Sequence, residues 1–484
     1  MGNKASTQSN LIKEKLDYFS DNERQNIEIL LKKLSDDSSN VEFQKHPFWP
    51  RLPQELQKGL LAFMQANSPA SKNPPTLDSP VSAFGLIESA RLLTKVSTFE
   101  KADAAFQLAS LSCSSLRSFV EIISYLGVQE WWRGSGRNRD NFGDCNSENI
   151  ALSRLVDYIL VSYKLKPDIP EEEVEQEAMC WKRNCENAIP QINEFQDWFE
   201  STFSFRVLFL LIFRQLFFGR FGKEGPNLPA EGDLKHGVYE GVIAPPLLSP
   251  FKTSFSEIIT PYDYFLLVAY LPPNCRQVNF PHQLLFSSRR DGASFTAFTN
   301  AIIDAGSTLL VVKDKNGKVF GGFADADWEQ RPNFYGNQKN FLFTLDPLRL
   351  YRTSSYNTNF QYLNFGAQTL PNGLGMGGQL DYFGLWIASD FLHGHSKAGP
   401  LCSTYNSPCL ATNQDFLVDD VEVWLVRPTD KDPTQMARKV KRSILDSNPE
   451  AMEILEMATN RKMYSKDVRD SKESEDEKEE SDVK

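Results

Sequence analysis

The segment LLVVKDKNGKVFGGF, residues 309–323, decides the fold class of the second half of the chain. Its two runs rich in β-branched and aromatic side chains, Leu309–Lys313 and Val319–Phe323, flank a polar pentapeptide that contains Asn316-Gly317. Asn-Gly supplies the two positive φ angles that a type I′ turn requires, and such a turn matches the twist of the strands that it joins. The segment therefore predicts an antiparallel hairpin closed by a type I′ turn.

Strand-like segments continue on both sides of this hairpin. Residues 242–427 contain 29 of the 58 aromatic residues and 14 of the 27 glycines, a composition typical of strands and tight turns. Ser294–Asp304 has helical spacing, and a few helices are expected among the strands of this half. The further predicted strands are Phe341–Leu345, Leu348–Arg352, Phe360–Asn364, Phe383–Ile387 and Val421–Val426. We therefore predict an α+β fold in which this half forms a two-sheet antiparallel β-sandwich with flanking helices.

The first half of the chain has a helical pattern instead. Ser20-Asp21-Asn22-Glu23 fits a capping box, and the apolar residues at positions 27, 30, 31 and 34 recur with helical spacing. Trp131–Asn149, rich in Gly, Asn and Arg, is predicted to be a loop. The other predicted helices are Glu55–Ala66, Val81–Leu93, Phe99–Leu111 and Leu116–Leu126.

Paired helices with short connectors resemble EF-hand units, but the calcium chemistry is missing. The candidate loop Ser35–Glu42 has acidic residues without the glycine that a calcium loop needs at its sharp turn. We therefore expect an EF-hand-like helical region and no metal site in it.

Composition narrows the class of protein. In 484 residues, 52 Lys and Arg stand against 63 Asp and Glu, a net charge of −11, which argues against nucleic-acid binding. Seven cysteines without a CxxC pair predict neither a disulfide framework nor a zinc ribbon, so we expect a reduced, cytosol-facing protein. The most apolar segment, Phe205–Phe221, is interrupted by arginines and is predicted to be a buried helix.

The amino terminus carries a lipidation pattern. Met1-Gly2-Asn3-Lys4-Ala5-Ser6 fits N-myristoylation, which needs Gly2 because its unhindered amine accepts the acyl chain. One myristoyl chain gives only marginal, reversible membrane binding. No cysteine stands near Gly2 for a second acyl chain, so we expect a membrane-bound protein partner to supply the second contact.

Three clusters in the second half suggest chemistry, and each has a simpler interpretation. Gly373, Gly375 and Gly378 fit GxGxxG, but a predicted strand follows them, so close backbone approach or left-handed backbone explains them better. The carboxylates of Asp325, Asp327 and Glu329 suit acid–base work only if they converge.

The third cluster combines imidazoles and thiols. His393 and His395 with Cys402 and Cys409 could hold a metal ion, although their spacing fits no regular zinc site and packed cysteines are the simpler interpretation. A redox role for either cysteine would require a lowered thiol pKa.

Eight short motifs in the second half are similar to the core of the TLDc domain. They are residues 284–292, Phe295, 321–324, 341–343, 375–378, 382–386, 404–406 and 421–424. The whole chain resembles a subfamily of TLDc proteins linked to TOR and Akt signalling. This resemblance implies a two-sheet TLDc sandwich, a divergent EF-hand-like region, and binding to subunits of the vacuolar proton-pumping ATPase. It also implies a role in TOR and insulin–Akt–FoxO signalling in growth, stress and lifespan.

The domain boundaries follow from these patterns. After the TLDc domain, Ser447–Glu450 fits a capping box, and Ile454 and Leu455 lie on the apolar stripe of a short helix that is predicted to bind a partner. The predicted parts are a flexible myristoylated terminus (1–19), the EF-hand-like region (20–130), a helical linker region (131–241), the TLDc domain (242–428), a basic segment with a helix (429–460) and a disordered charged tail (461–484).

These observations predict a non-enzymatic regulator. We expect no cofactor apart from myristate on Gly2, and no catalytic residues. Gly375, Gly377 and Gly378 are predicted to belong to the partner-binding surface. The protein is expected on the cytosolic face of the plasma or lysosomal membrane, with a cytoplasmic pool. The alternative is an enzyme or a redox-protective protein that uses the TLDc loops.

Overall fold

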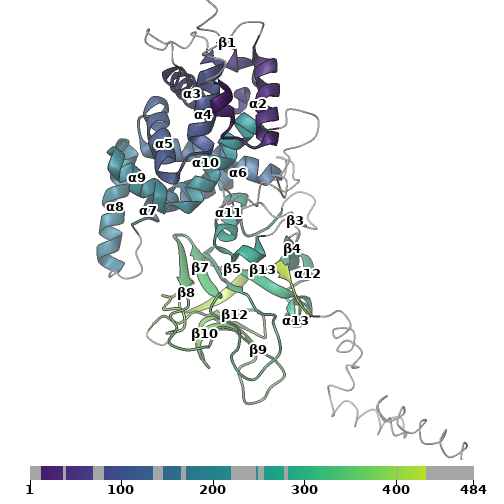
Figure 1. Ribbon diagram of the computed structural model, residues 1–484. Helices are drawn as coiled ribbons and strands as arrows, with labels where there is room; N and C mark the ends of the chain where they lie inside the picture. Colours follow the sequence, from purple (N-terminus) through teal and green to yellow (C-terminus); the bar gives the residue numbers. More distant parts are fainter. Residues whose placement is uncertain are drawn as a thin grey trace, which may run out of the picture. The chain divides into compact units, whose positions relative to one another are not determined.

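Helices fill the first half of the chain and strands most of the second, which confirms the α+β fold (Figure 1). The computed structural model describes residues 12–35, 40–68, 81–134, 145–164, 171–219, 247–248, 255–276, 282–399 and 402–431. Contacts group Met1–Pro428 into one unit and Thr429–Lys484 into a second. The predicted sites at Gly2, Ile454 and Leu455 lie outside the described residues.

The predicted helices are confirmed, and several more join them. The helices are α2 (Asp21–Leu34), α3 (Gln54–Ala66), α4 (Ala83–Thr94), α5 (Thr98–Ser112), α6 (Leu116–Gly134), α7 (Cys145–Val161), α8 (Glu171–Asn187), α9 (Ile192–Ser201), α10 (Phe203–Phe218), α11 (Pro261–Tyr270), α12 (Ser288–Asp291) and α13 (Phe295–Ile302). Short 3₁₀ turns occur at Phe43–Lys45, Trp49–Arg51 and Pro273–Cys275.

The strands include every predicted one and add β1 to β4, β10 and β12. They are β1 (Asn40–Val41), β2 (Val81–Ser82), β3 (Leu247–Leu248), β4 (His282–Ser287), β5 (Gly306–Asp314), β6 (Val319–Ala324), β7 (Phe341–Leu345), β8 (Leu348–Arg352), β9 (Tyr362–Asn364), β10 (Gly373–Gln379), β11 (Tyr382–Ala388), β12 (His393–His395) and β13 (Asp415–Pro428).

The capping box at the start of α2 also ties three helices together. The Ser20 hydroxyl and the Glu23 side chain bond reciprocally to each other's backbone N–H groups. Glu23 is buried, and its carboxylate also pairs with Lys95 just after α4 (2.5 Å) and Arg214 of α10 (3.2 Å). Two cations therefore compensate the desolvation of this carboxylate.

The segment that follows α2 pairs with the segment that precedes α4. β1 and β2 run antiparallel, with Val41 opposite Val81. The ladder thus joins the connection between α2 and α3 to the connection between α3 and α4, and the EF-hand-like character of the region stays a prediction.

Helix α10 occupies the centre of the helical region. Ten of its residues are buried, and it contacts α2, α4, α6 and α9. The prediction of a buried helix there is confirmed. In the described part of the chain no single helix is long and apolar enough to cross a membrane. The pair α9–α10, bent by 93°, reaches that length and apolar composition only when its two helices are taken together.

The prediction of a loop at Trp131–Asn149 is partly wrong. Helix α6 continues to Gly134 and buries Trp131 and Trp132. Burial of two indole rings outweighs the weak helix propensity of the residues that follow them.

The predicted hairpin is confirmed, but its turn is not of type I′. Only Gly317 has a positive φ (89°), and its N–H donates to the carbonyl of Asp314 (2.9 Å). The Asp314 carboxylate accepts the N–H groups of Asn316 (3.0 Å) and Lys318 (2.9 Å). A buried aspartate thus fixes a three-residue loop that ends in a left-handed glycine, and Asn316 needs no positive φ.

The two predicted sheets are not separate. Hydrogen bonds connect the strands in the order β8-β7-β6-β5-β13-β12-β11-β10-β9, and β4, with β3, pairs at the side of β13. β13 connects the two halves into one sheet, because its first residues pair with β12 and its later residues pair with β5 and β4. The halves still share one core, in which Leu310 and Leu342 pack with Leu374, Met376 and Leu385.

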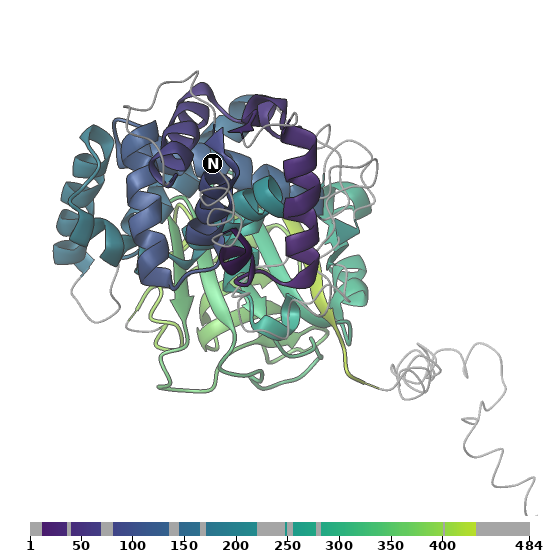
Figure 2. The same ribbon diagram turned by 45° about the horizontal axis from the view of Figure 1, so that its top comes forward.

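Helix α11 joins the helical region to the sheet. Nine of its ten residues are buried, and it contacts α6 and α7. Its Tyr264 ring lies 5.4 Å from Trp424 of β13 and 6.2 Å from Trp131 of α6. Figure 1 shows α11 between the helices and the strands, and Figure 2 shows the helices of the first half grouped on one side of the green strands.

One ion pair fixes the position of this helix. Asp263 caps α11, since its carboxylate accepts the Thr260 N–H (3.0 Å), and it also pairs with Arg154 of α7 (3.1 Å). The Asp263 side chain is only 4% exposed, so loss of Arg154 or of the Thr260 N–H donor would leave a buried carboxylate partly uncompensated.

A second buried carboxylate ties the segment before α11 to the sheet. Glu422 of β13 accepts hydrogen bonds from Ser256 Oγ (2.6 Å), the Glu257 N–H (2.8 Å) and Trp424 Nε1 (3.3 Å). Burial raises the pKa of Glu422 from 4.5 to about 7, although these hydrogen bonds oppose the change.

Glu422 makes the stability of the fold depend on pH. Because the folded protein holds this proton more tightly than the unfolded chain, the stabilisation is complete below pH ~4.5 and is lost as the pH rises through about 7. Between pH 5 and pH 8 the free energy of unfolding should fall by about 2–3 kcal/mol relative to a Glu422→Gln variant. Urea denaturation at both pH values measures this difference. Glu121→Gln, on the exposed face of α6, should change with pH as the native protein does, and a pH-independent difference between native and Glu422→Gln would contradict the assignment.

Candidate interaction surface and acidic cluster

The glycine-rich segment is a strand. Gly373–Gln379 forms β10 between β9 and β11, and a two-residue turn leads directly into β11. A dinucleotide site needs a helix after the glycines, so that its N-terminus can face the pyrophosphate. The described residues that follow form a strand instead, which supports the structural interpretation of these glycines.

Gly375 makes room for aromatic rings on the face of β10 and β11 that points away from the shared core. It pairs with Trp386, and a β-carbon at position 375 would lie 2.3 Å from Phe383 Cδ1. Phe383 and Trp386 stack at 4.4 Å, and Trp386 stacks on His395 at 5.9 Å. Phe383 and Trp386 form a second, smaller apolar cluster with Tyr362. Glycine therefore allows the rings to lie flat across the neighbouring strand.

Gly377 and Gly378 hold the end of the β10–β11 hairpin. Their φ angles are 72° and 81°, in the left-handed region that favours glycine. The Gly378 N–H donates to Thr404 Oγ1 (2.9 Å), and its carbonyl accepts from Asn359 Nδ2 (2.7 Å).

These buried glycines place exposed side chains at the hairpin tip. Leu380 and Tyr382 are exposed there, directly after the glycines. A partner contact of Gly375, Gly377 and Gly378 stays a prediction, and their geometry gives them a supporting role beneath such a surface.

The histidines and cysteines do not converge. His393 is exposed and its Nδ1 lies 2.6 Å from Asp390 Oδ2, whereas His395 Nε2 accepts the Phe383 N–H (3.3 Å). Cys402 is buried next to Ser407 Oγ (3.4 Å). Within the described ranges these four side chains form no group close enough to hold a metal ion. Burial raises the pKa of Cys402 and of Cys409, the opposite of what a reactive thiol needs.

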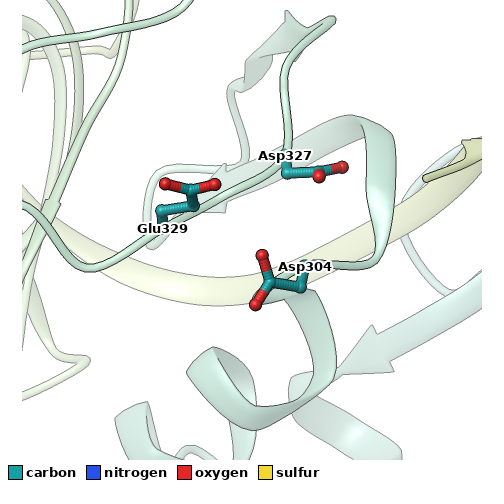
Figure 3. A group of neighbouring side chains, drawn as sticks. All are labelled: Asp304, Asp327 and Glu329. Atoms are coloured by element: carbon teal, nitrogen blue, oxygen red, sulfur yellow. The ribbon is translucent and has the colours of Figure 1, made fainter. Parts of the chain in front are cut away.

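One group of carboxylates does converge, and it differs from the predicted one. Ligand oxygens of Asp304, Asp327 and Glu329 lie within 4.8 Å of one another (Figure 3). Asp304 follows α13 with φ 57°, and its N–H donates to the Trp328 carbonyl (3.0 Å). This backbone contact between distant segments was not visible in the sequence.

Asp325, predicted as the third member, points elsewhere. Its carboxylate accepts from Asn337 Nδ2 (2.8 Å) and lies 3.5 Å from Lys339 Nζ. Within the cluster, Arg331 Nε donates to Glu329 Oε2 (2.7 Å), so a guanidinium already neutralises one of the three carboxylates.

The class of domain in the second half of the chain follows from comparison with known families. Residues 252–427 match the family model of the TLDc domain, so this part of the chain is a TLDc domain, as its motifs predicted.

Named proteins from several organisms are similar to part of this chain. The mTOR-associated protein MEAK7 of Mus musculus is 43% identical over 235 residues, which are 48% of this chain and 50% of that protein. The protein of the same name from Xenopus laevis is 47% identical over 208 residues, 43% of this chain and 44% of its own length. Oxidation resistance protein 1 of Bos taurus is 27% identical over 200 residues, 41% of this chain and 21% of its own length. The chain thus spans about half the length of these relatives or less.

The role of Gly375 can be tested by adding one methyl group. Gly375→Ala should lower the free energy of unfolding by about 1–3 kcal/mol, because the new Cβ overlaps Phe383. Gly399→Ala is the matched control, since a Cβ there meets open space, and it should change the stability by less than about 1 kcal/mol. Equal effects in chemical denaturation would show that the ring does not press on the glycine.

The acidic cluster can be tested with divalent cations. Because Arg331 occupies Glu329, millimolar Ca²⁺ or Mg²⁺ should change Tm by less than about 1 °C relative to EDTA. Differential scanning fluorimetry measures the change. A rise of several degrees that is abolished in an Asp327→Asn variant would instead identify a cation site.

Proposed function

We propose that this chain is a non-enzymatic regulator linked to mTOR signalling, and that its TLDc domain works by binding a protein partner. The observation that carries the proposal is the 43–47% identity with proteins that are named mTOR-associated. A shared TLDc domain at this identity supports a shared mode of action, although the similarity covers about half of each relative.

The geometry of the candidate catalytic groups supports binding over chemistry. Glu329 is engaged by Arg331, and Asp325 lies outside the acidic cluster. Burial lowers the pKa of His395 to about 4, so this imidazole is a poor proton carrier near neutral pH.

The finer proposal concerns partner and place. We infer that the partner is the vacuolar proton-pumping ATPase, bound through its subunits, and that TOR and insulin–Akt–FoxO signalling follow from this contact. Myristate on Gly2 would bring the protein to the cytosolic face of the plasma or lysosomal membrane, with a cytoplasmic pool and no other cofactor. A single acyl chain binds weakly, so the ATPase supplies the second contact.

The competing function is redox protection, which the name of the Bos taurus relative suggests. It would require a reactive thiol in the TLDc loops, and the raised pKa values of Cys402 and Cys409 argue against one. Peroxide consumption by the purified chain, abolished in a Cys402→Ser variant, would favour this function instead.

A binding experiment tests the proposal directly. Purified vacuolar ATPase, immobilised in detergent, should retain the full-length chain with a Kd in the micromolar range or below. Bovine serum albumin at the same density is the control surface. Failure of the chain to bind intact ATPase would remove this partner from the account.

The lipid can be tested at one residue. Gly2→Ala should move most of the protein from the membrane to the soluble fraction of cells, because the acceptor amine is blocked by a methyl group on the neighbouring carbon. Ser6→Thr keeps the pattern and should leave the distribution unchanged. Fractionation and intact mass measure both, and an unmodified amine on Gly2 in the native protein would contradict the prediction.

A further inference from the structure

A shallow hollow lies where β11, β12 and β13 meet. Its volume is about 380 Å³, and its floor is the stacked pair Trp386 and His395. His395 stays uncharged near neutral pH because burial lowers its pKa to about 4. The floor is therefore uncharged, largely aromatic and already packed in place. Ala388, His393, Asp415 and Leu417 also line the hollow.

One exposed leucine, Leu417, lines the hollow, and a second, Leu392, directly precedes the lining residue His393 in the chain. Leu417 pairs with His393, and the Val418 N–H donates to the Leu392 carbonyl (2.8 Å), so both leucines lie at the same edge of β12 and β13. Leu392 is 46% and Leu417 44% exposed. A well-packed aromatic centre surrounded by a more polar rim is common at protein-binding hot spots, and the exposed leucines add apolar area that a partner could cover.

The rim around the hollow is acidic. The side chain of Asp415 is 80% exposed, whereas its partner Lys397, 2.8 Å away, is only 19% exposed. Asp390, half exposed, lies beside His393, and Asp381 in the β10–β11 turn is exposed and close enough to affect the charge of His395. The carboxylates of Asp381, Asp390, Asp415 and Asp419 thus outnumber the ammonium groups of Lys313, Lys315 and Lys397 around this rim.

This charge selects the class of partner. Anionic lipid headgroups and nucleic acid would be repelled by the rim. A polypeptide that carries lysine or arginine next to an apolar side chain would satisfy both the rim and the floor.

We propose that this hollow binds an apolar side chain of a protein partner, flanked in that partner by lysine or arginine. The proposal rests on the proposed function, since it names the contact by which the TLDc domain holds a partner. It assigns the recognition to Leu392 and Leu417 for the apolar part and to Asp415 for the basic part.

Two synthetic peptides test the charge selection on the full-length chain. One fluorescein-labelled peptide has a central leucine pair flanked by arginines, and the other has glutamates in place of the arginines. In fluorescence anisotropy the arginine peptide should bind at least about tenfold more tightly, with an advantage that shrinks as salt is added. Equal affinities, or no binding of the arginine peptide at millimolar concentration, would overturn the proposal.

Variants locate the binding on the surface. Leu392→Ala combined with Leu417→Ala should weaken the arginine peptide about tenfold or more. Leu111→Ala on α5 removes an equally exposed leucine (46%) elsewhere and should have no effect. Asp415→Asn, at a side chain too exposed to disturb the fold, should reduce the preference for arginine over glutamate. Unchanged affinity and preference in these variants would refute the location.

The same variants separate this inference from the proposed function. If the purified ATPase binds the native chain and the double leucine variant equally well, the hollow is not the contact, while the proposed function stands. If the native chain fails to bind the ATPase but discriminates between the two peptides at the hollow, the partner is wrong and the docking site stands.

Discussion

The burial of α11 is the constraint on which the rest of the structure depends. This helix is hydrophobic on nearly all sides, so it needs apolar partners on both sides, and it finds them in Trp131 of α6 and Trp424 of β13. Asp263 sets its position by capping its first turn and pairing with Arg154 of α7. The buried residues of the helical region, of α11 and of the near face of the sheet consequently belong to one hydrophobic cluster. A TLDc domain that begins with this helix therefore shares its stability with the helices that precede it.

The far part of the sheet carries the docking site that we propose. Because β10 is rich in glycine, it fills little space with side chains, and Phe383 and Trp386 of β11 can lie across it. Such a stacked floor is rigid before any partner arrives, which reduces the ordering that binding must impose. The edge strand β9 is covered, because its Leu363 carbonyl accepts the Arg331 N–H (2.9 Å) and the preceding Gln361 exchanges backbone hydrogen bonds with Tyr335 (2.9 Å each). A partner would therefore meet side chains there and not an open strand edge.

The sequence predicted features that depend on local pattern, and it missed those that depend on distant contacts. The strand-forming runs on either side of Asn316-Gly317 predicted the β5–β6 hairpin, and the capping box with helical spacing predicted α2. The turn type was missed because Asp314 is held by the Thr412 N–H, 98 positions away. The strand β10 was not predicted, because its glycines have no side chains to show a strand pattern and the side chains that pack there belong largely to β11. Asp304 joins Asp327 and Glu329 only through the backbone bridge between Ile303 and Trp328. The sandwich prediction failed in one respect, because β13 is long enough to pair with both halves of the sheet.

Hydrogen exchange on an Asp263→Asn variant tests the shared core most directly. This change removes the charge that pairs with Arg154 and weakens the cap of α11. If α11 couples the two regions, mass spectrometry under mild urea should show faster exchange by similar factors in α6 and in β13, which lie on opposite sides of it. Faster exchange confined to the helices, with β13 as protected as in the native chain, would contradict the account.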